Sequence, residues 1–265
     1  TTMFELHDEA KRQGRDLGSV TSSASGATLV PPELVKRIDE QTASRAAPGN
    51  GYGLTETSGA AVANGGQNYV SRPDSVGRPV APVMDIKIVD ENNVELAVGE
   101  AGEICIQGPT VFKGYFNLPD ATEAAIVDGW FHTGDVGKLD DDGYLYVVDR
   151  LKDVIIRGGE NIYAAEIEAV LYEHPDVQEA AIVGLPDDKY GEIVAAFLRL
   201  HDGATITEDG IRDWVRGRLA AFKVPAVVDI RHDPLPRNAN GKVLTRSSVE
   251  HTCDPQSPAN RVCRP

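Results

Sequence analysis

Apolar and polar residues alternate with a period of two through the middle of the chain. Ile86 and Ile88 are separated by a polar residue, and Ile104 and Ile106 repeat this pattern in GEICIQG. Asparagine and glycine residues between the two stretches are typical of tight turns. Short strands joined by tight turns predict a small β-barrel or sheet over this region.

The pattern is mixed beyond about residue 150. Continuous apolar runs at 180–184 and 193–200 predict buried strands, and the run at 227–230 predicts a further strand. Before this last strand, apolar residues recur at the spacing of a helix face. The helical stripe consists of Ile211, Trp214, Val215 and Leu219. Strands and helices in this order favour an α+β arrangement.

The segment Asp149–Glu168 joins the two regions. Its first residues are charged and predict an exposed joint, and the apolar run 154–156 predicts a buried strand. Gly158 and Gly159 follow, and glycines can adopt positive φ or let a ligand approach the backbone closely. A helical pattern comes next. A glycine loop that enters a helix can bind an anion, although an ordinary strand-to-helix turn has the same pattern.

Length and composition are those of an ordinary globular protein. The chain has 265 residues, 41% hydrophobic and 25% charged, enough for one large domain or two modest ones with real cores. The formal net charge of −15 argues against nucleic acid or an anionic membrane as a general partner, because both need a basic face. An anionic ligand would have to be held by local donors.

The three cysteines show no metal-ligand spacing. Cys105 lies in a predicted strand, while Cys253 and Cys263 lie in a proline-rich tail, where a surface disulfide and simple exposure are both open. This usage favours a reducing, cytoplasmic setting over a disulfide scaffold. We expect neither a membrane span nor a signal segment, since no run approaches the roughly twenty apolar residues of a span.

The stretch Asn50–Ser58, NGYGLTETS, carries the first candidate site. Tyr52 lies between glycines and can present its face to a purine. The hydroxyl of Thr55 can bond a phosphate oxygen, and the carboxylate of Glu56 can hold a hard cation. A Thr-Glu pair alone is more often a solvated helix start, so the interpretation depends on the other motifs.

Two further motifs carry candidate chemistry. In WFHTGD, a Thr-Gly-Asp turn exposes the carboxylate of Asp135, whose two oxygens suit the vicinal hydroxyls of a ribose, although a tight turn capped by an aspartate is the alternative. His132 has no role that this interpretation requires. Near the C-terminus, the loop Pro234–Lys242 closes on an Asn-Gly turn. It presents Lys242 as a compact charge on a long stem, or as an ordinary surface lysine.

In sequence order, these motifs resemble those of the adenylate-forming (AMP-binding) superfamily, which includes acyl-CoA synthetases, peptide-synthetase adenylation domains and luciferases. The string at 149–168 resembles the fatty-acid and aryl acid:CoA ligase branch. The resemblance implies the adenylate-forming enzyme fold, with α/β and α+β parts. Its implied divisions are 1–149, the C-terminal part of the large AMP-binding domain with the end of an α/β sheet and a small β-barrel; 150–251, a small mobile α+β domain; and 252–265, a tail.

The resemblance also implies roles in nucleotide binding. Tyr52 would stack on adenine, Thr55 would contact the α-phosphate, and Glu56 would ligate Mg²⁺. Asp135 would bind the ribose, with Arg150 supporting the nucleotide beside it. The other implied ATP-binding or AMP-binding residues are Ser25, Gly26 and Ala27, on a turn that lines the adenine pocket, and Gly53.

Further roles concern a second step with coenzyme A. Lys152 stands at the position that the family uses as hinge, although a surface lysine would look the same. Gly158, Gly159 and Glu160 would contact the pantetheine of coenzyme A after the small domain swings about the hinge. Lys242 falls on the lysine that serves adenylation in the family. The block GEICIQGPTVFKGY is interpreted as mostly structural.

The implied activity is that of an ATP-dependent acid:CoA ligase of fatty-acid type. A carboxylic acid reacts with Mg·ATP to give an acyl-adenylate and pyrophosphate, and the thiol of CoA then displaces AMP. The family's phosphate-binding loop precedes the adenine turn and is not in this sequence. We therefore expect the chain to be a fragment whose partner is the missing N-terminal half of the same enzyme, and which is inactive alone.

Three alternatives stay open. A carrier-protein-loading adenylation domain shares most motifs, but the GGENIYAAEIE string resembles CoA ligases more closely. A luciferase-type oxygenase shares the motifs as well. A non-catalytic regulatory fragment could retain the fold without the phosphate-binding loop. The acid is equally open, and the string around Lys152 gives only a preference for a fatty acid.

Overall fold

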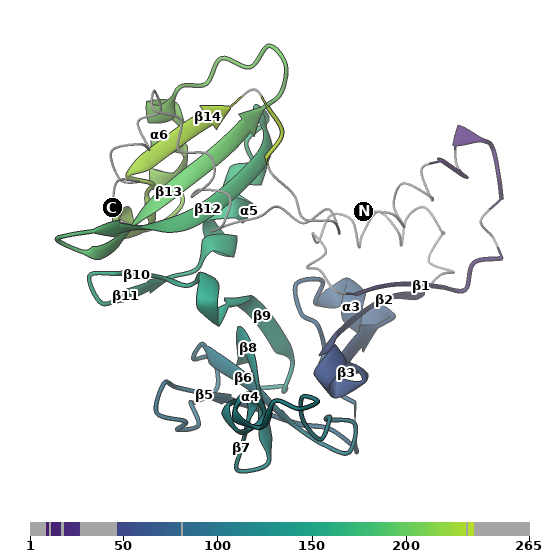
Figure 1. Ribbon diagram of the computed structural model, residues 1–265. Helices are drawn as coiled ribbons and strands as arrows, with labels where there is room; N and C mark the ends of the chain where they lie inside the picture. Colours follow the sequence, from purple (N-terminus) through teal and green to yellow (C-terminus); the bar gives the residue numbers. More distant parts are fainter. Residues whose placement is uncertain are drawn as a thin grey trace. The chain divides into compact units, whose positions relative to one another are not determined.

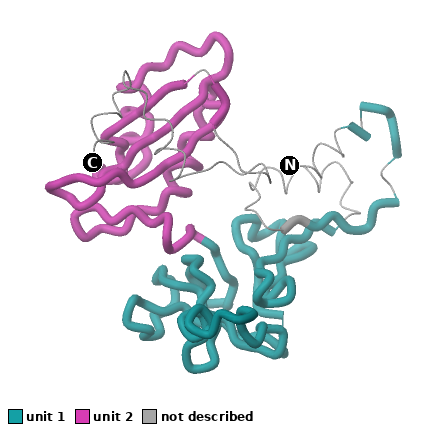
Figure 2. The backbone as a smooth tube through the Cα atoms, in the orientation of Figure 1, with its two compact units in different colours: residues 1–147 teal, residues 148–265 magenta. Residues whose placement is uncertain are grey.

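The alternating segments of the central region belong to one compact unit, residues 1–147, and the mixed region forms a second, residues 148–265 (Figures 1 and 2). The computed structural model describes residues 9–10, 12–16, 19–26, 47–80, 82–231 and 233–235. The division falls after Val147, and the boundary expected from the sequence lies after residue 149. The expected tail at 252–265 lies outside the described residues.

The first sheet of residues 1–147 carries the stretch around Tyr52. Its strand order is β1-β2-β3-β4, with β1 parallel to β2 and the other neighbours antiparallel. This mixed sheet stands where the sequence predicted the end of an α/β sheet. Its elements are β1 (Ser22–Gly26), β2 (Ala47–Leu54), the 3-10 turn η1 (Thr55–Thr57), β3 (Gly59–Gly65), α3 (Gln67–Ser71) and β4 (Arg78–Pro79).

The second sheet of residues 1–147 has the order β5-β6-β8-β7, and β9 pairs with β8. Ile88, Ile104 and Ile106 are buried, as their alternation predicted, and pack with Val62 of the first sheet in one core. The two sheets therefore share their apolar faces. The elements are β5 (Asp85–Val89), β6 (Gly102–Gln107), α4 (Pro119–Ala125), β7 (Ile126–Val127), β8 (Trp130–Leu139) and β9 (Leu145–Arg150).

The second unit is an α+β domain built on a third sheet. Its order is β11-β10-β13-β12, and β14 runs parallel to β13. Two helices pack against the core of this sheet through residues such as Ile167 and Ile211 (Figure 1). The elements are η2 (Leu151–Asp153), β10 (Ile155–Arg157), β11 (Glu160–Ile162), α5 (Ala164–Tyr172), β12 (Val177–Asp187), β13 (Gly191–Leu200), α6 (Glu208–Arg216), η3 (Ala221–Lys223) and β14 (Val227–Arg231).

One expected local structure is wrong. The glycine pair was predicted to form a loop leading into a helix, but Gly158 and Gly159 form the two-residue turn of the β10–β11 hairpin. Their φ values of 61° and 89° are typical of such a turn. Helix α5 begins only at Ala164, after the second strand. The turn N–H groups are therefore not those of a helix N-terminus.

Candidate functional site

The stretch around Tyr52 makes a sharp exit from strand β2. A side chain at Gly53 would meet the carbonyl oxygen of Gly59 at 1.9 Å, so only glycine fits. The pairing of β2 with β3 shifts register at this point. Thr57 closes the turn, since its hydroxyl accepts from Leu54 N–H at 2.9 Å and donates to Gly59 O at 2.7 Å. The turn leaves Thr55 exposed at its start.

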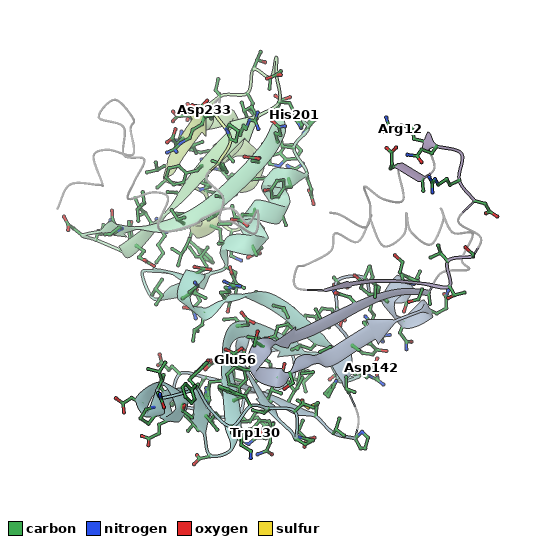
Figure 3. All side chains as sticks on the ribbon, turned by 45° about the vertical axis from the view of Figure 1, so that its right-hand side comes forward. Arg12, Glu56, Trp130, Asp142, His201 and Asp233 are labelled. Atoms are coloured by element: carbon green, nitrogen blue, oxygen red, sulfur yellow. The ribbon has the colours of Figure 1, made fainter. Side chains whose placement is uncertain are left out.

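Glu56 lies in this turn (Figure 3). The loop that follows β6 holds it. The Tyr115 hydroxyl donates to Glu56 Oε1 at 2.9 Å, and Phe112 N–H donates to the Glu56 carbonyl at 2.7 Å. Desolvation and the nearby Glu56 carboxylate raise the pKa of Tyr115. The hydroxyl therefore stays protonated and keeps the carboxylate oriented. Mg²⁺ is commonly held by one or two carboxylates plus substrate phosphates, and the donor type of Glu56 fits this pattern.

Asp135 protrudes from a bulge in strand β8. Glu103 pairs with Val136 and Cys105 pairs with His132, so one residue of β6 faces three residues of β8. These three residues are Thr133, Gly134 and Asp135, the Thr-Gly-Asp motif. Bulges next to active sites commonly redirect a side chain away from the plane of the pleat.

The structure brings Tyr52 and Asp135 together. The Tyr52 hydroxyl donates to Asp135 Oδ2 at 2.7 Å, although the two residues are far apart in sequence. Both side chains are half-buried. An aromatic ring and a carboxylate beside it are the groups expected to recognise an adenine and a ribose. Two motifs that the sequence connected only by resemblance thus meet at one place.

Two residues next to the bulge, Glu103 and His132, had no chemical role assigned from the sequence. His132 Nδ1 lies 2.8 Å from Glu103 Oε2, and Gly134 N–H donates to Glu103 Oε1 at 2.9 Å. Cys105 Sγ lies 3.6 Å from the same nitrogen of His132. Burial, and then the charge of Glu103, raise the pKa of the Cys105 thiol to about 12. The available sequence signal was that Glu103 precedes Ile104 in an alternating strand and so lies on the opposite face of β6.

The charged segment around Arg150 and Lys152 belongs to the second unit, as does the glycine turn. Arg150 and Lys152 are exposed, at the end of β9 and in η2. Asp149 Oδ2 accepts from Ala165 N–H in the first turn of α5 at 3.2 Å, and desolvation raises the pKa of Asp149. This bond joins the segment before η2 to the helix that follows the hairpin.

The glycine turn presents open backbone. Gly158 N–H donates to the Tyr190 carbonyl at 2.8 Å, and nothing lies within 4 Å of the position that a Gly159 side chain would take. Glu160 is exposed beside it on β11. A ligand can therefore approach Gly159 closely, as a pantetheine arm would require.

The remaining candidates are placed only in part. Ser25 and Gly26 end β1, where they pair with Asn50 and Gly51 of β2. Their backbone thus lies beside the stretch that carries Tyr52. Ala27 and Lys242 lie outside the described residues.

Two family models match this chain. The model described as "AMP-binding enzyme" matches residues 1–116, and "AMP-binding enzyme C-terminal domain" matches residues 166–242. Among the described residues, no helix is long and apolar enough to cross a membrane.

Curated relatives are similar over nearly the whole chain. A long-chain-fatty-acid–CoA ligase of Bacillus subtilis is 42% identical over 94% of this chain and 44% of the relative. A feruloyl-CoA synthase of an Amycolatopsis species is 40% identical over 92% of this chain and 49% of the relative. The chain thus spans about half the length of the curated relatives it matches.

A solved structure of a CoA synthetase is also similar to this chain over about half of its own length. The o-succinylbenzoate CoA synthetase of Bacillus subtilis in complex with AMP is 36% identical, with a TM-score of 0.80 over 91% of this chain and 48% of that one. The same enzyme is known in complex with ATP and magnesium ion, with a TM-score of 0.75.

Proposed function

Because the chain belongs to the AMP-binding family of adenylate-forming enzymes and to its acid:CoA ligase branch, as its motifs predicted, we propose that it is the C-terminal part of an ATP-dependent acid:CoA ligase. The predicted adenylate-forming fold, with the end of an α/β sheet, a small β-barrel and an α+β domain, is confirmed by the likeness to the o-succinylbenzoate CoA synthetase. The observation that carries the proposal is the 2.7 Å hydrogen bond between Tyr52 and Asp135.

This bond supports a nucleotide site because it joins two different recognition chemistries. The half-buried Tyr52 ring offers a face for adenine, and Asp135 offers two oxygens to ribose hydroxyls. Thr55, exposed at the start of the next turn, is within the same short stretch as Tyr52 and would contact the α-phosphate. The order base, ribose, phosphate would then follow from Tyr52, Asp135 and Thr55.

The proposed reaction has two steps. The carboxylate of the acid attacks the α-phosphorus of ATP, and pyrophosphate leaves. The CoA sulfur then attacks the acyl carbon, and AMP leaves with the electrons of the broken carbon–oxygen bond. The first step joins two anions, so catalysis consists chiefly of positioning and charge neutralisation.

Charge neutralisation would come from Glu56 and Lys242. Glu56, oriented by Tyr115, would hold Mg²⁺, whose charge offsets that of the phosphates. Lys242 would bring a point charge to the α-phosphate in the first step. A swing about Lys152 would then withdraw Lys242 and bring the Gly158–Gly159 turn to the pantetheine. Exposure of Lys152 and open space at Gly159 support this part.

For the carboxylic acid substrate, the proposal extends only to its chemical class. Relatives of nearly equal identity act on long-chain fatty acids and on ferulate, as their names state. We favour a fatty or aryl acid, in line with the string around Lys152. The carrier-protein and regulatory alternatives remain the competing proposals for the acceptor and for activity.

The decisive experiment compares this chain with a version extended upstream to the length of its relatives. Each is incubated with ATP, Mg²⁺, CoA and a panel of carboxylic acids, and CoA thioesters are detected by mass spectrometry. We expect thioester from the extended protein alone and weak ATP binding by the short chain in calorimetry. Stoichiometric tight ATP binding by the short chain would contradict the fragment hypothesis. No thioester from either protein would favour carrier loading or regulation.

A second experiment separates the half-reactions in the extended protein. Lys242→Ala should slow formation of the acyl-adenylate far more than transfer from supplied acyl-adenylate to CoA, because the lysine acts only in the first step. Lys223→Ala, which removes a lysine paired with Glu166 in the second unit, is the control. Equal loss in both half-reactions would contradict the role assigned to Lys242.

A further inference from the structure

We propose that Glu103 is a positioning residue for nucleotide recognition: together with His132 it holds the Thr133–Asp135 bulge in the shape that presents Asp135 to a ribose. The inference rests on the proposed function, because it needs a nucleotide at Asp135. It assigns a role to a residue in the block that the sequence indicated as mostly structural.

A bulge of this size removes backbone groups from the sheet pairing and requires other partners for them. Side chains supply these partners here. Gly134 N–H donates to Glu103 Oε1 at 2.9 Å, and Asp135 N–H donates to Thr133 Oγ1 at 3.1 Å. The Thr133 hydroxyl in turn donates to the Ile104 carbonyl at 2.8 Å. The bulge is thus tied to β6 at two points, through Gly134 and Thr133, and Asp135 is bonded to Thr133.

The Glu103 side chain connects this bulge to the residue that precedes it. One carboxylate oxygen holds Gly134, inside the bulge, and the other lies 2.8 Å from Nδ1 of His132, which precedes it. The two side chains are only 17% and 16% exposed, so water competes little for these bonds. Bonds to a carboxylate are stronger than those between neutral groups. Gly134, at φ 70°, is in the left-handed region that the turn needs.

The same residues could suggest a metal centre, because ligand atoms of Glu103, Cys105 and His132 lie within 4.8 Å of one another. The imidazole argues against it. A histidine that ligates a metal normally donates its other ring N–H to a partner. Here Nδ1 faces both Glu103 and Cys105, and the buried Nε2 has no hydrogen-bond partner. A neutral imidazole that donates from Nδ1 to Glu103 avoids a buried, unpartnered N–H.

If Glu103 acts through Asp135, its loss should be visible in recognition of the ribose rather than in the rest of the nucleotide. Without the bonds from Glu103 to Gly134 and His132, the Asp135 carboxylate would no longer be fixed opposite the ribose hydroxyls. Affinity for ATP should fall, while affinity for a nucleotide that lacks one of those hydroxyls should change less. A residue with only a general structural role would weaken both nucleotides equally.

The test uses the extended protein without acid or CoA and measures binding of Mg·ATP and Mg·3′-deoxy-ATP by calorimetry. The variants are Glu103→Ala, Glu103→Gln, Asp135→Ala and the double variant Glu103→Ala/Asp135→Ala. Glu100→Ala is the matched control, since Glu100 accepts one backbone N–H, that of Ala97, in another turn of the same unit. Thermal unfolding of each variant is recorded in parallel.

We expect Glu103→Ala to weaken ATP binding by about tenfold or more and to bring the ratio of the two affinities close to one. Glu103→Gln should restore part of the ratio, because its amide oxygen can still accept from Gly134. The double variant should bind like Asp135→Ala alone, because Glu103 has no effect once Asp135 is absent. Glu100→Ala should leave the ratio unchanged.

Three results would overturn the inference. The first is a Glu103→Ala protein that melts at lower temperature but retains the ratio of the unsubstituted protein. The second is additive losses in the double variant. The third is stoichiometric zinc in the purified protein that Cys105→Ala removes, which would make the cluster a metal centre. Failure of the unsubstituted extended protein to bind ATP would instead refute the proposed function.

Discussion

Two turns with left-handed glycines carry the proposed chemistry, and they are built in opposite ways. In the Thr133–Asp135 bulge, side chains of Glu103 and Thr133 bond the backbone and hold the Asp135 carboxylate in one place. In the Gly158–Gly159 turn, the Gly158 N–H instead donates to another backbone group, the Tyr190 carbonyl. A side chain would find open space at both Gly134 and Gly159, so crowding does not explain the difference.

The difference reflects what each turn presents. A carboxylate that must meet two hydroxyls needs a fixed direction, and buried charged bonds provide it. A surface along which a thin pantetheine arm passes needs the absence of a side chain more than a fixed one. The first turn should therefore be sensitive to loss of hydrogen bonds, and the second to added volume.

The largest expected effect is that of Asp135→Ala. It removes the acceptor for both ribose hydroxyls, and charged hydrogen bonds of about 1.5–3 kcal/mol imply a loss of roughly a hundredfold in ATP affinity. The measurement is calorimetry on the extended protein. Asp142→Ala, which removes an exposed carboxylate paired with Arg72, is the control and should bind ATP normally. Retention of ATP affinity by Asp135→Ala would remove the basis for calling the bulge a nucleotide site.

The second effect concerns volume at the glycine turn. Gly159→Val places a branched side chain at φ 89°, a backbone conformation that costs about 1–3 kcal/mol, and fills the proposed path of pantetheine. Transfer from supplied acyl-adenylate to CoA should slow more than about tenfold, while adenylation is unchanged. The assay follows the two half-reactions separately.

Gly203→Val is its matched control. Gly203 has a φ of 84° with nothing within 4 Å, in a turn of the same unit after β13. Both substitutions should lower stability to a similar extent, but only Gly159→Val should affect the transfer step. A similar loss in both variants would mean that strain, rather than a ligand path, explains the effect at Gly159.

The sequence predicted the elements well where one periodicity dominated. Ile104 and Ile106 alternate and are buried in β6, and Ile167 and Leu171 are buried in α5 at the expected helical spacing. It failed at the glycine pair, because 160–162 is too short a run for its strand character to be seen before the helix. Pairing with Ile155–Arg157, a contact made in the folded chain, decides that conformation.

The candidate site was predictable residue by residue but not as an arrangement. Tyr52 and Asp135 each belonged to a recognisable motif, and their hydrogen bond follows from packing of two sheets. Glu103 and His132 gave no comparable signal, since their contact depends on the register shift that creates the bulge. Such a shift is a property of strand pairing and leaves little trace in a single sequence.

A smaller effect should follow from Thr133→Val, which keeps the shape of the side chain but removes its hydroxyl. The substitution leaves the Asp135 N–H and the Ile104 carbonyl without this partner. We expect ATP affinity to fall by roughly three- to tenfold, in line with about 0.5–1.5 kcal/mol for one hydrogen bond. Thr207→Val, whose hydroxyl accepts from Gly210 N–H at the start of α6 in the second unit, is the control for loss of a threonine hydroxyl. If Thr133→Val binds ATP normally while Glu103→Ala does not, Glu103 holds the bulge through Gly134 alone.

The smallest expected effect concerns Cys105 of β6, whose sulfur lies near His132 at the start of the Thr133–Asp135 bulge. Its side chain is fully buried, and burial raises the pKa of the thiol to about 12, from a reference value of 9.0. The folded protein therefore keeps the proton between these values while the unfolded chain loses it, so this contribution to stability is present below pH 9 and declines as pH rises towards 12. Iodoacetamide at pH 8 should alkylate the Cys105 peptide at least about a hundredfold more slowly in the folded protein than in urea, because the thiolate is the reactive form. Cys105→Ala should reduce the alkaline decline in stability without changing the ratio of ATP to 3′-deoxy-ATP affinity. Rapid alkylation in the folded protein would show that β6 opens near Glu103, and a brace on an open strand could not hold Asp135 in a fixed direction.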